Sequence, residues 1–485
     1  MTTTVIKDID WAIAWDAAQD QHIFRQGVDV VFEDDKITHV GRGYAGHADV
    51  TVPGRDRMVM PGLVDIHSHP EHEPAYRGIR EEHGLRNMYM SGLFERSQAL
   101  SGTDDESRGA SAEFAYCELL RSGVTTLVDI SPPWDGWQDL LVKSGLRAYL
   151  APGFASARWK LENDHDLKYV WDENLGRERF ATALKVVDAA VRHPSNRLGG
   201  VISPMQIDTC SAELLRDSRA AAGERKMPFT VHIAQGVNEV LEMIRRHGMT
   251  PVQWAAEIGI MGPDTILAHA IFLDSHSWMK WWSRKDLNLI AENGCTVAHC
   301  PTPFARYGQI LEDFGSYLRA GVNMGIGTDT TPHNMLEEMR KAAVLARIAA
   351  RDIDTVSTAD ILHAATVGGA KALMRNDLGR LAPGMKADIV LVDLKCTDMM
   401  PARDPLRSLV YHAAERAVHD VYIDGRQVVA AGKVLGLDHA GAAERLVEAQ
   451  RRMMAAAPTR DYLGRGADEI APLSLRLIPE EPRGH

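Results

Sequence analysis

The sequence predicts an α/β fold, a (β/α)8 TIM-like barrel with a small β-sandwich built from both chain ends. Through the middle of the chain, eight short apolar runs alternate with helical patterns. Both ends carry strand-like segments instead of this alternation. The chain has 485 residues. At roughly 100–200 residues per domain, this length suits one large barrel with an appended domain.

The candidate barrel strands are short runs rich in Val, Ile and Leu, and they span residues 62–66, 125–130, 147–150, 200–202, 229–232, 265–269, 296–299 and 323–327. Segments with the apolar spacing of amphipathic helices separate them, including 111–122, 177–192, 212–223 and 238–247. A later helix is expected to begin after Ser357, which suits an N-cap, with Asp360 in its first turn. Strands that alternate with helices in this way form a parallel sheet, and eight repeats close a barrel.

The two chain ends predict the second domain. Residues 28–32 and 37–40 flank a polar turn and predict a hairpin, and residues 387–393, 418–425 and 427–429 are again strand-like. We therefore expect a sandwich that combines residues 1–58 with 377–436, around a barrel at 59–376. The tail, 437–485, contains an amphipathic helix at 442–456, and we expect it to pack on the barrel or on a second subunit.

Composition restricts the class of partner. The net charge is −12 and no Lys/Arg cluster stands out, so no nucleic-acid partner is expected. No apolar run reaches the roughly 18–20 residues that span a bilayer, and no secretory signal is visible, so no membrane partner is expected. The five cysteines include no CxxC pair, which argues against a disulfide framework and a thiolate zinc site. We expect a cytoplasmic protein with a small-molecule substrate.

The strongest chemical signal is the apolar run 62–66 followed by His67-Ser68-His69. Side chains on a strand repeat their direction every second residue, so His67 and His69 face the same way. They lie at the carboxyl end of the first predicted barrel strand, which is the end where barrel active sites form. Two neutral imidazoles there can bind one metal ion. Alone, the pair is explained as well by two polar strand-end histidines without a metal.

Three later runs lead to residues of the same kind. Two apolar runs end in His232 and His269, and the run 323–327 leads to Asp329. Each could be an ordinary polar residue at a strand end. Because all of them fall at the carboxyl ends of strands in one predicted barrel, together they favour a metal site.

The HxH pair, the two later histidines, the segment Gly327-Thr328-Asp329 and the order of these features resemble the amidohydrolase superfamily over nearly the whole chain. Segments 122–129 and 379–391 resemble its second barrel strand and the strand that returns to its small sandwich. Within the superfamily, the nearest branch is that of s-triazine hydrolases and cytosine deaminases. The segments around His67 and Gly327 are most similar to phenylurea and molinate hydrolases.

The resemblance implies a role for individual residues. His67, His69, His232 and Asp329 would be the metal ligands. Asp329 and His269 would be catalytic, Asp329 by accepting a proton from water and His269 by polarising the substrate carbonyl or helping to take that proton. Binuclear relatives use a carboxylated lysine on strand four, and this chain has none at 201–206, so one divalent metal is expected. Zn²⁺ is the first expectation, with Fe²⁺ or Co²⁺ as alternatives.

One departure from the family pattern bears on the reaction. Deaminase-type relatives carry a glutamate three residues after the strand-five histidine, and here that position is Gln235. An amide cannot give up a proton near neutral pH, so ring attack that needs a protonated ring nitrogen loses its proton shuttle. The expected reaction is therefore hydrolysis of a non-peptide C–N bond, in an amide, urea or carbamate, by metal-activated water. The alternatives are an aminohydrolase (deaminase or dechlorinase type) acting on a triazine, pyrimidine or purine ring, and a non-catalytic barrel scaffold.

Substrate-binding residues are expected in the loops after the strands. Gln235 would orient the substrate, and His299 would border the pocket without binding the metal. Among the loop aromatics, Trp134, Trp159 and Phe304 are expected to line the mouth of the barrel. Such walls suit a small apolar or aryl-bearing substrate. The resemblance also implies a homo-oligomer.

Overall fold

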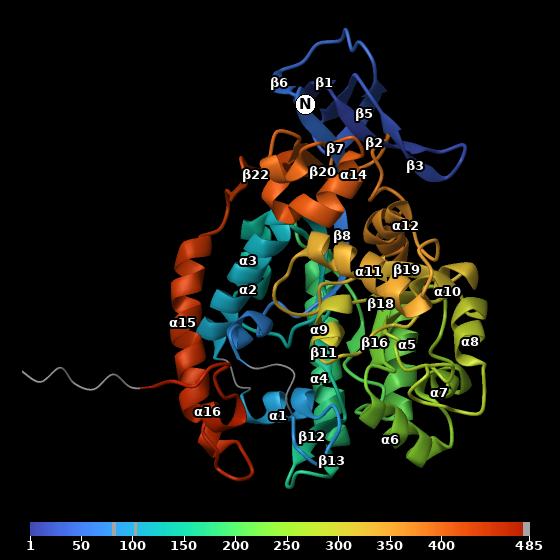
Figure 1. Cartoon of the computed structure of the whole chain (residues 1–485), viewed down its shortest axis with the longest axis vertical. Helices are drawn as coiled ribbons and strands as arrows, with labels where there is room; N and C mark the ends of the chain where they lie inside the picture. The colour runs from blue at the N-terminus through green and yellow to red at the C-terminus, as the bar shows by residue number, and fades with distance from the viewer. Residues whose placement is uncertain (80–83, 101–103, 479–485) are drawn as a thin grey trace, which may run out of the picture.

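The computed structural model describes residues 1–79, 84–100 and 104–478, and it contains the expected α/β barrel (Figure 1). Its parallel strands pair in the order β14-β10-β9-β8-β19-β18-β17-β16. A bridge between Ile202 and Phe229 joins the two edges of this sheet and closes it. The strands are β8 (Leu63–Ser68), β9 (Val124–Asp129), β10 (Arg147–Leu150), β14 (Leu198–Gly200), β16 (Phe229–Ile233), β17 (Thr265–His269), β18 (Thr296–His299) and β19 (Asn323–Ile326).

The fourth barrel strand differs most from its predicted bounds. Strand β14 ends at Gly200, although the apolar run continues to Ile202. The amide of Val201 still donates to Leu150 of β10, at 2.9 Å, whereas the amide of Ile202 donates to Pro228 beside β16, at 3.0 Å. The chain therefore changes its pairing partner at this point, and the regular strand stops there.

Helices connect the strands and cover the outside of the barrel (Figure 1). Side-chain caps start several of them: Asp104 accepts from the amide of Ser107, and Asp172 from that of Leu175. No helix among the described residues is long and apolar enough to cross a membrane. The helices outside the tail are α1 (Gly92–Ala99), α2 (Asp105–Arg121), α3 (Trp137–Ser144), α4 (Glu173–Val191), α5 (Ala212–Arg225), α6 (Val237–His247), α7 (Pro251–Glu257), α8 (Asp286–Glu292), α9 (Pro301–Arg306), α10 (Phe314–Arg319), α11 (Met335–Ala350), α12 (Thr358–His363), α13 (Gly369–Ala372) and α14 (Pro405–Ser408).

The N-terminal strands and the strands of residues 389–434 meet at one end of the molecule (Figure 1). One sheet has the order β5-β4-β1-β6, and a second has the order β23-β22-β21-β20-β7-β2-β3. Strand β7 from the N-terminal segment pairs antiparallel with β20 from the C-terminal segment, and residues of both sheets share one buried apolar cluster. The strands are β1 (Thr3–Ile9), β2 (Trp11–Asp16), β3 (Gln21–Arg25), β4 (Val28–Glu33), β5 (Lys36–Gly41), β6 (Val50–Pro53), β7 (Arg57–Pro61), β20 (Ile389–Asp393), β21 (Val418–Ile423), β22 (Arg426–Ala430) and β23 (Lys433–Val434).

The tail packs on the barrel of its own chain. Helix α15 (His439–Ala456) lies against α2, and Leu446 and Met453 join a buried cluster with Ala75 and Leu100. The side-chain amide of Gln450 on α15 also donates to the carbonyls of Ala75 and Arg77, at 2.7 Å each. These residues follow β8, so the tail helix supports the loop that leaves this strand.

Candidate metal centre

The four predicted metal ligands converge at the carboxyl ends of β8, β16 and β19. The distance between His69 Nε2 and His232 Nε2 is 3.2 Å. Asp329 Oδ1 lies 3.6 Å from His67 Nε2 and 3.5 Å from His69 Nε2. All four side chains are buried. The structure thus brings together residues that are up to 262 positions apart, from His67 to Asp329. Two groups of side chains could each hold a metal ion, one of His67, His69 and His232 and one of His67, His269, Cys300 and Asp329, and His67 belongs to both.

The donor set fits a divalent metal. His69 Nδ1 faces the carbonyl of Ile130 at 3.0 Å, and His232 Nδ1 faces the carbonyl of Met205. Since a carbonyl only accepts, each Nδ1 carries the proton and each Nε2 a lone pair. Two lone pairs that face each other at 3.2 Å repel unless a cation lies between them. Two Zn–N bonds of about 2.0–2.1 Å at a tetrahedral angle would hold the nitrogens roughly 3.3 Å apart.

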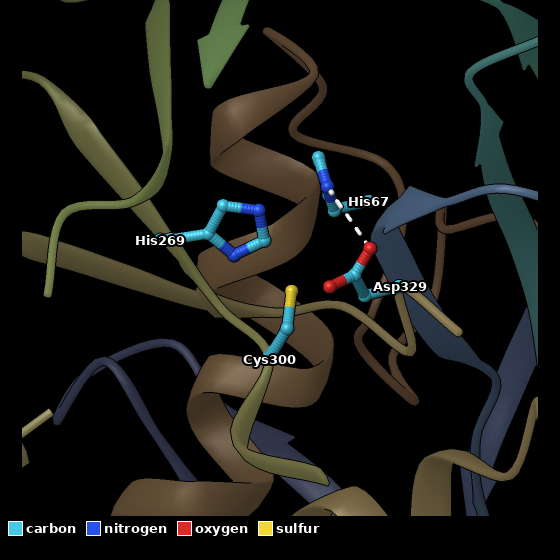
Figure 2. Close-up of side chains that lie close together, drawn as sticks. All are labelled: His67, His269, Cys300 and Asp329. Atoms are coloured by element: carbon cyan, nitrogen blue, oxygen red, sulfur yellow. Dashed lines mark ion pairs between the residues drawn. The ribbon is translucent and has the colours of Figure 1, made fainter. Parts of the chain in front are cut away.

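His269 approaches the same point from β17. Its ring centroid lies 4.8 Å from that of His67 and 4.7 Å from that of Phe304. Figure 2 shows His269 and Cys300 facing His67 and Asp329. Neither ring nitrogen of His67 or His269 has a hydrogen-bond partner in the described part of the chain. Burial, with the charge of Asp329, raises the pKa of the Cys300 thiol well above its usual range, so it stays protonated and is no nucleophile.

The protonation states at the centre also suit a metal. Burial lowers the pKa of His69, His232 and His269 well below the usual 6.5. These imidazoles are therefore neutral near neutral pH, which is the form that binds metal. Burial would raise the pKa of Asp329, but the contact with His67 Nε2 at 3.6 Å and the other nearby imidazoles hold this pKa below its ordinary value. Asp329 is thus a carboxylate among neutral imidazoles.

The backbone at the site is held in a strained conformation. Asp329 and His269 have φ angles of +57° and +77°, in the left-handed region that costs a non-glycine residue of order 1–3 kcal/mol. The amide of Asp329 donates to the carbonyl of His67 at 2.8 Å. A Cβ on Gly327 would lie 2.6 Å from the Cβ of His67, so only glycine permits this close approach of β19 to β8.

A buried carboxyl joins the two strands that carry His67 and Asp329. Asp65 accepts from the amide of His67 at 3.1 Å and from the hydroxyl of Thr328 at 2.7 Å. Burial raises the pKa of Asp65 to about 7, against the effect of these hydrogen bonds. Asp65 therefore positions the ligands without contacting the metal position itself.

The centre opens into a cavity of about 210 Å³. Of the expected substrate residues, Gln235, Trp159 and Phe304 line it, whereas Trp134 and His299 are not among the described residues that do. Trp134 packs beside the backbone of Gly136, where an added Cβ would lie 3.6 Å from its ring. The ring of His299 lies 5.4 Å from that of Phe314, and Phe304 separates it from the cavity. These two expectations are corrected because both side chains turn into packing between loops and helices.

The cavity is also lined by residues that were not predicted as site residues, among them Glu73, Arg96, Gln206, Glu239 and Gln309. Glu73 follows the HxH segment by four residues and was within reach of sequence reasoning. Gln206 and Gln309 lie in irregular segments, and Arg96 lies on the short helix α1. No strand-end pattern marks these three positions, so the sequence gives no signal for them.

A closed barrel with an imidazole-rich cation site at the carboxyl ends of its strands defines a metal-dependent hydrolase. The profile of the Amidohydrolase family matches residues 58–428, and the chain belongs to this family. It is accordingly a metal-dependent hydrolase that acts on carbon–nitrogen bonds other than peptide bonds.

Deaminases are among the proteins to which this chain is similar. The chain is 30% identical over 402 residues, 82% of this chain and 88% of the relative, to a 5-methylthioadenosine/S-adenosylhomocysteine deaminase of Thermococcus kodakarensis. It is 28% identical over 410 residues, 84% and 90% of the two chains, to a 5'-deoxyadenosine deaminase of Methanothermobacter thermautotrophicus. Its fold matches a zinc-bound adenosine deaminase from Xanthomonas campestris, with a TM-score of 0.80, 24% identity and coverage of 94% and 99%.

Proposed function

We propose that this protein is an aminohydrolase that releases ammonia from an amino-substituted nitrogen heterocycle of the adenosine type. The observation that carries the proposal is that three of the proposed metal ligands, His69, His232 and Asp329, line one cavity with aromatic walls. His67 and His269 lie beside them, with ring centroids 4.7 and 5.3 Å from that of His232. The deaminase relatives, which match over about four-fifths of the chain, support this reaction over the amide or urea hydrolysis expected from the sequence.

The residues at the centre account for the chemistry. His67, His69, His232 and Asp329 would hold one divalent metal, which when bound lowers the pKa of a coordinated water toward neutrality. Asp329 is a carboxylate at neutral pH and accepts the proton of the attacking water. His269 is neutral and uncommitted, so it donates a hydrogen bond to the group that gains negative charge. Asp329 then returns the proton to the departing amine.

Ring attack also needs a proton donor, because Gln235 cannot supply a proton. We assign this role to Glu239 on α6, which lines the cavity next to Gln235. Its carboxyl accepts from the amides of Ala234 and Gln235, at 2.6 and 2.8 Å. Burial, together with the charge of Asp208, raises the pKa of Glu239 well above its usual range. A carboxyl in this state holds a proton near neutral pH and can donate it.

Gln235 favours a second candidate, hydrolysis of an amide, urea or carbamate, because such a carbonyl needs no prior protonation. The oxygen of Gln235 accepts from Gln206 Nε2 at 2.8 Å, so its amide is held in place as a neutral group. The resemblance to phenylurea and molinate hydrolases supports this candidate.

A substrate screen separates the two candidates. Zinc-loaded protein would be incubated with 5'-methylthioadenosine, adenosine, a phenylurea and an anilide, and released ammonia and released amine would be measured separately. The proposal expects ammonia from the adenosines. Release of aniline without ammonia from either nucleoside would overturn it in favour of the second candidate.

The role of Glu239 is tested by rescue. We expect Glu239→Gln to lower ammonia release by about 10²–10⁴-fold, the usual contribution of a general acid. Adding Gln235→Glu to that variant restores a carboxyl beside the metal centre and should recover much of the rate. If the double variant stays as slow as Glu239→Gln, the assignment is wrong.

We further propose Zn²⁺ as the metal and a homo-oligomer as the assembly. The zinc in the similar adenosine deaminase structure supports the first, and the family resemblance supports the second. Metal analysis by mass spectrometry and light scattering after gel filtration test them. Another metal at full occupancy, or a monomer at micromolar concentration, would refute the respective proposal.

A further inference from the structure

Gln309 is a buried cavity residue whose side-chain amide has no bonding partner. It lies after α9 and lines the same cavity as the metal ligands, with a side chain that is 1% exposed. Neither its Nε2 nor its Oε1 has a hydrogen-bond partner among the described residues. Buried polar side chains in folded proteins almost always have one, so an uncommitted amide bordering a cavity indicates a group that arrives from outside.

The backbone holds Gln309 close to the catalytic residues. Its amide donates to the carbonyl of Phe304 at 2.8 Å. The ring of Phe304 in turn lies 4.7 Å from the ring of His269. The side chain of Gln309 is thus attached to a fixed turn of the chain, while its polar end remains available for a ligand.

The other polar groups around the cavity indicate the charge of that ligand. Arg96 and Glu73 form an ion pair at 3.3 Å. Neither charge of this pair is therefore left for a ligand. Gln206 Nε2 is used by Gln235, but Gln206 Oε1 is buried and has no partner in the described part of the chain. The buried groups that line the cavity without a partner, among the described residues, are therefore uncharged: both amide atoms of Gln309, the amide oxygen of Gln206 and the hydroxyl of Thr330.

We propose that Gln309 recognises the substrate by pairing with an uncharged edge that carries a hydrogen-bond donor next to an acceptor. A carboxamide, a urea, or the amino group and ring nitrogen of an aminoazine has such an edge. The remainder of the substrate would lie against the apolar walls of the cavity, which include Leu93, Phe94 and Trp159. This recognition rests on the proposed function, and it names the part of the substrate that the cavity binds.

The test measures binding, so that it does not depend on turnover. Zinc-loaded wild-type protein and Gln309→Met would be titrated calorimetrically with benzamide and with acetophenone, which has a similar shape but no donor. We expect the wild type to prefer benzamide by roughly 5- to 150-fold, the range for a buried hydrogen bond. Gln309→Met should lose this preference and keep its affinity for acetophenone. Equal binding of the two probes by the wild type, or a preference retained in the variant, overturns the proposal.

Thermal stability provides a second, ligand-free measurement. Because the amide of Gln309 has no partner within the described residues, Gln309→Met should leave the melting temperature unchanged or raise it. The matched control is Gln253→Met. The amide of Gln253 donates to Ser283 and Asp286, at 2.9 and 2.8 Å, so this variant should melt earlier and keep the wild-type probe preference. A melting temperature lowered as much by Gln309→Met as by the control would assign Gln309 to the fold and refute the proposal. Failure of the substrate screen with intact benzamide selectivity would instead refute only the deaminase assignment.

Discussion

Two clusters of buried charge occupy opposite ends of the barrel and differ in how completely they are paired. At the amino end of β10, the Arg147 guanidinium donates twice to Asp388, at 3.1 Å each, and again to Asp424. Asp388 also accepts from the amide of Asp424 at 2.8 Å. At the carboxyl ends of the strands, the ring nitrogens of His67 and His269 have no hydrogen-bond partners among the described residues, and His67 Nε2 has only the longer contact with Asp329, at 3.6 Å.

The difference separates a structural cluster from a catalytic one. The Arg147 cluster joins the barrel to the strands from the C-terminal segment, and each charge is neutralised by a neighbour of opposite sign. The metal centre leaves donor atoms uncommitted and holds Asp329 and His269 at positive φ, as expected of a site completed by a ligand. Disrupting the first cluster should therefore reduce stability, and disrupting the second should reduce activity.

The largest effect is expected for Asp329→Asn. The amide keeps the shape of the carboxyl but cannot accept the proton of water, so kcat should fall by about 10²–10⁴-fold. Metal content measured by mass spectrometry should fall only in part, because three histidines remain, and the melting temperature should stay near that of the wild type. Wild-type kcat in this variant would remove Asp329 from the mechanism.

The second-largest effect is expected for Arg147→Met, at the opposite cluster. The change leaves Asp388 buried without its cation, whereas Asp424 keeps Lys386 at 3.4 Å. The loss at Asp388 should cost about 3–5 kcal/mol of unfolding free energy, measured by urea denaturation. The kcat of the folded fraction should not change. Arg177→Met is the control, because the Arg177–Asp217 pair is about half exposed and should contribute less than about 1 kcal/mol. Equal losses in the two variants would contradict the structural role of Arg147.

The two clusters also differ in how far the sequence predicts them. His67, His69, His232 and Asp329 could be predicted because they follow apolar runs, and the carboxyl ends of parallel strands meet at one rim. Arg147 and Asp388 are 241 positions apart, and nothing local to either residue indicates their contact. The same apolar runs that lead to the ligands also mark the barrel strands, so most strand ends could be predicted closely.

Loop residues were predicted less well than strand-end residues. Trp159 and Phe304 reach the cavity, but Trp134 does not, although the sequence predicted all three as aromatic residues in loops after strands. Composition indicates that such rings are buried, whereas the direction of each ring depends on the packing of neighbouring loops. Gln309 illustrates the same limit, because its lack of a partner is visible only in three dimensions.

A smaller effect, on the pH dependence of metal binding, is expected at the catalytic cluster. Burial lowers the pKa of His69 and His232 well below 6.5, so few protons compete with the metal until the pH falls further. Zinc affinity should therefore change less than about threefold between about pH 7.5 and pH 6.5, and it should decrease when the pH is lowered further. A tenfold loss between those two values in calorimetric titrations would indicate histidines with ordinary pKa values.

The same shift gives the sign of a stability change in the metal-free protein. Below about pH 6.5 the unfolded chain binds protons at these histidines and the folded chain does not. The free energy of unfolding should therefore decrease as the pH falls through about 6.5. Chemical denaturation of the metal-free protein measures this, and an unfolding free energy that rises on acidification from about pH 7 to pH 6 would contradict the shift.

The smallest effect is expected for Thr328→Val, at the point where structural and catalytic groups meet. The Thr328 hydroxyl donates to Asp65 at 2.7 Å, and its loss should cost about 1–3 kcal/mol of unfolding free energy. Asp65 also accepts from the amide of His67, so kcat should fall with stability, by up to about tenfold. Thr331→Val is the control, because the Thr331 hydroxyl is buried without a partner in the part of the chain that the structure describes, and its loss should change neither quantity. If Thr328→Val lowers stability but not kcat, Asp65 has a structural role only. If stability and kcat decrease together, Asp65 also supports catalysis, although it does not contact the metal.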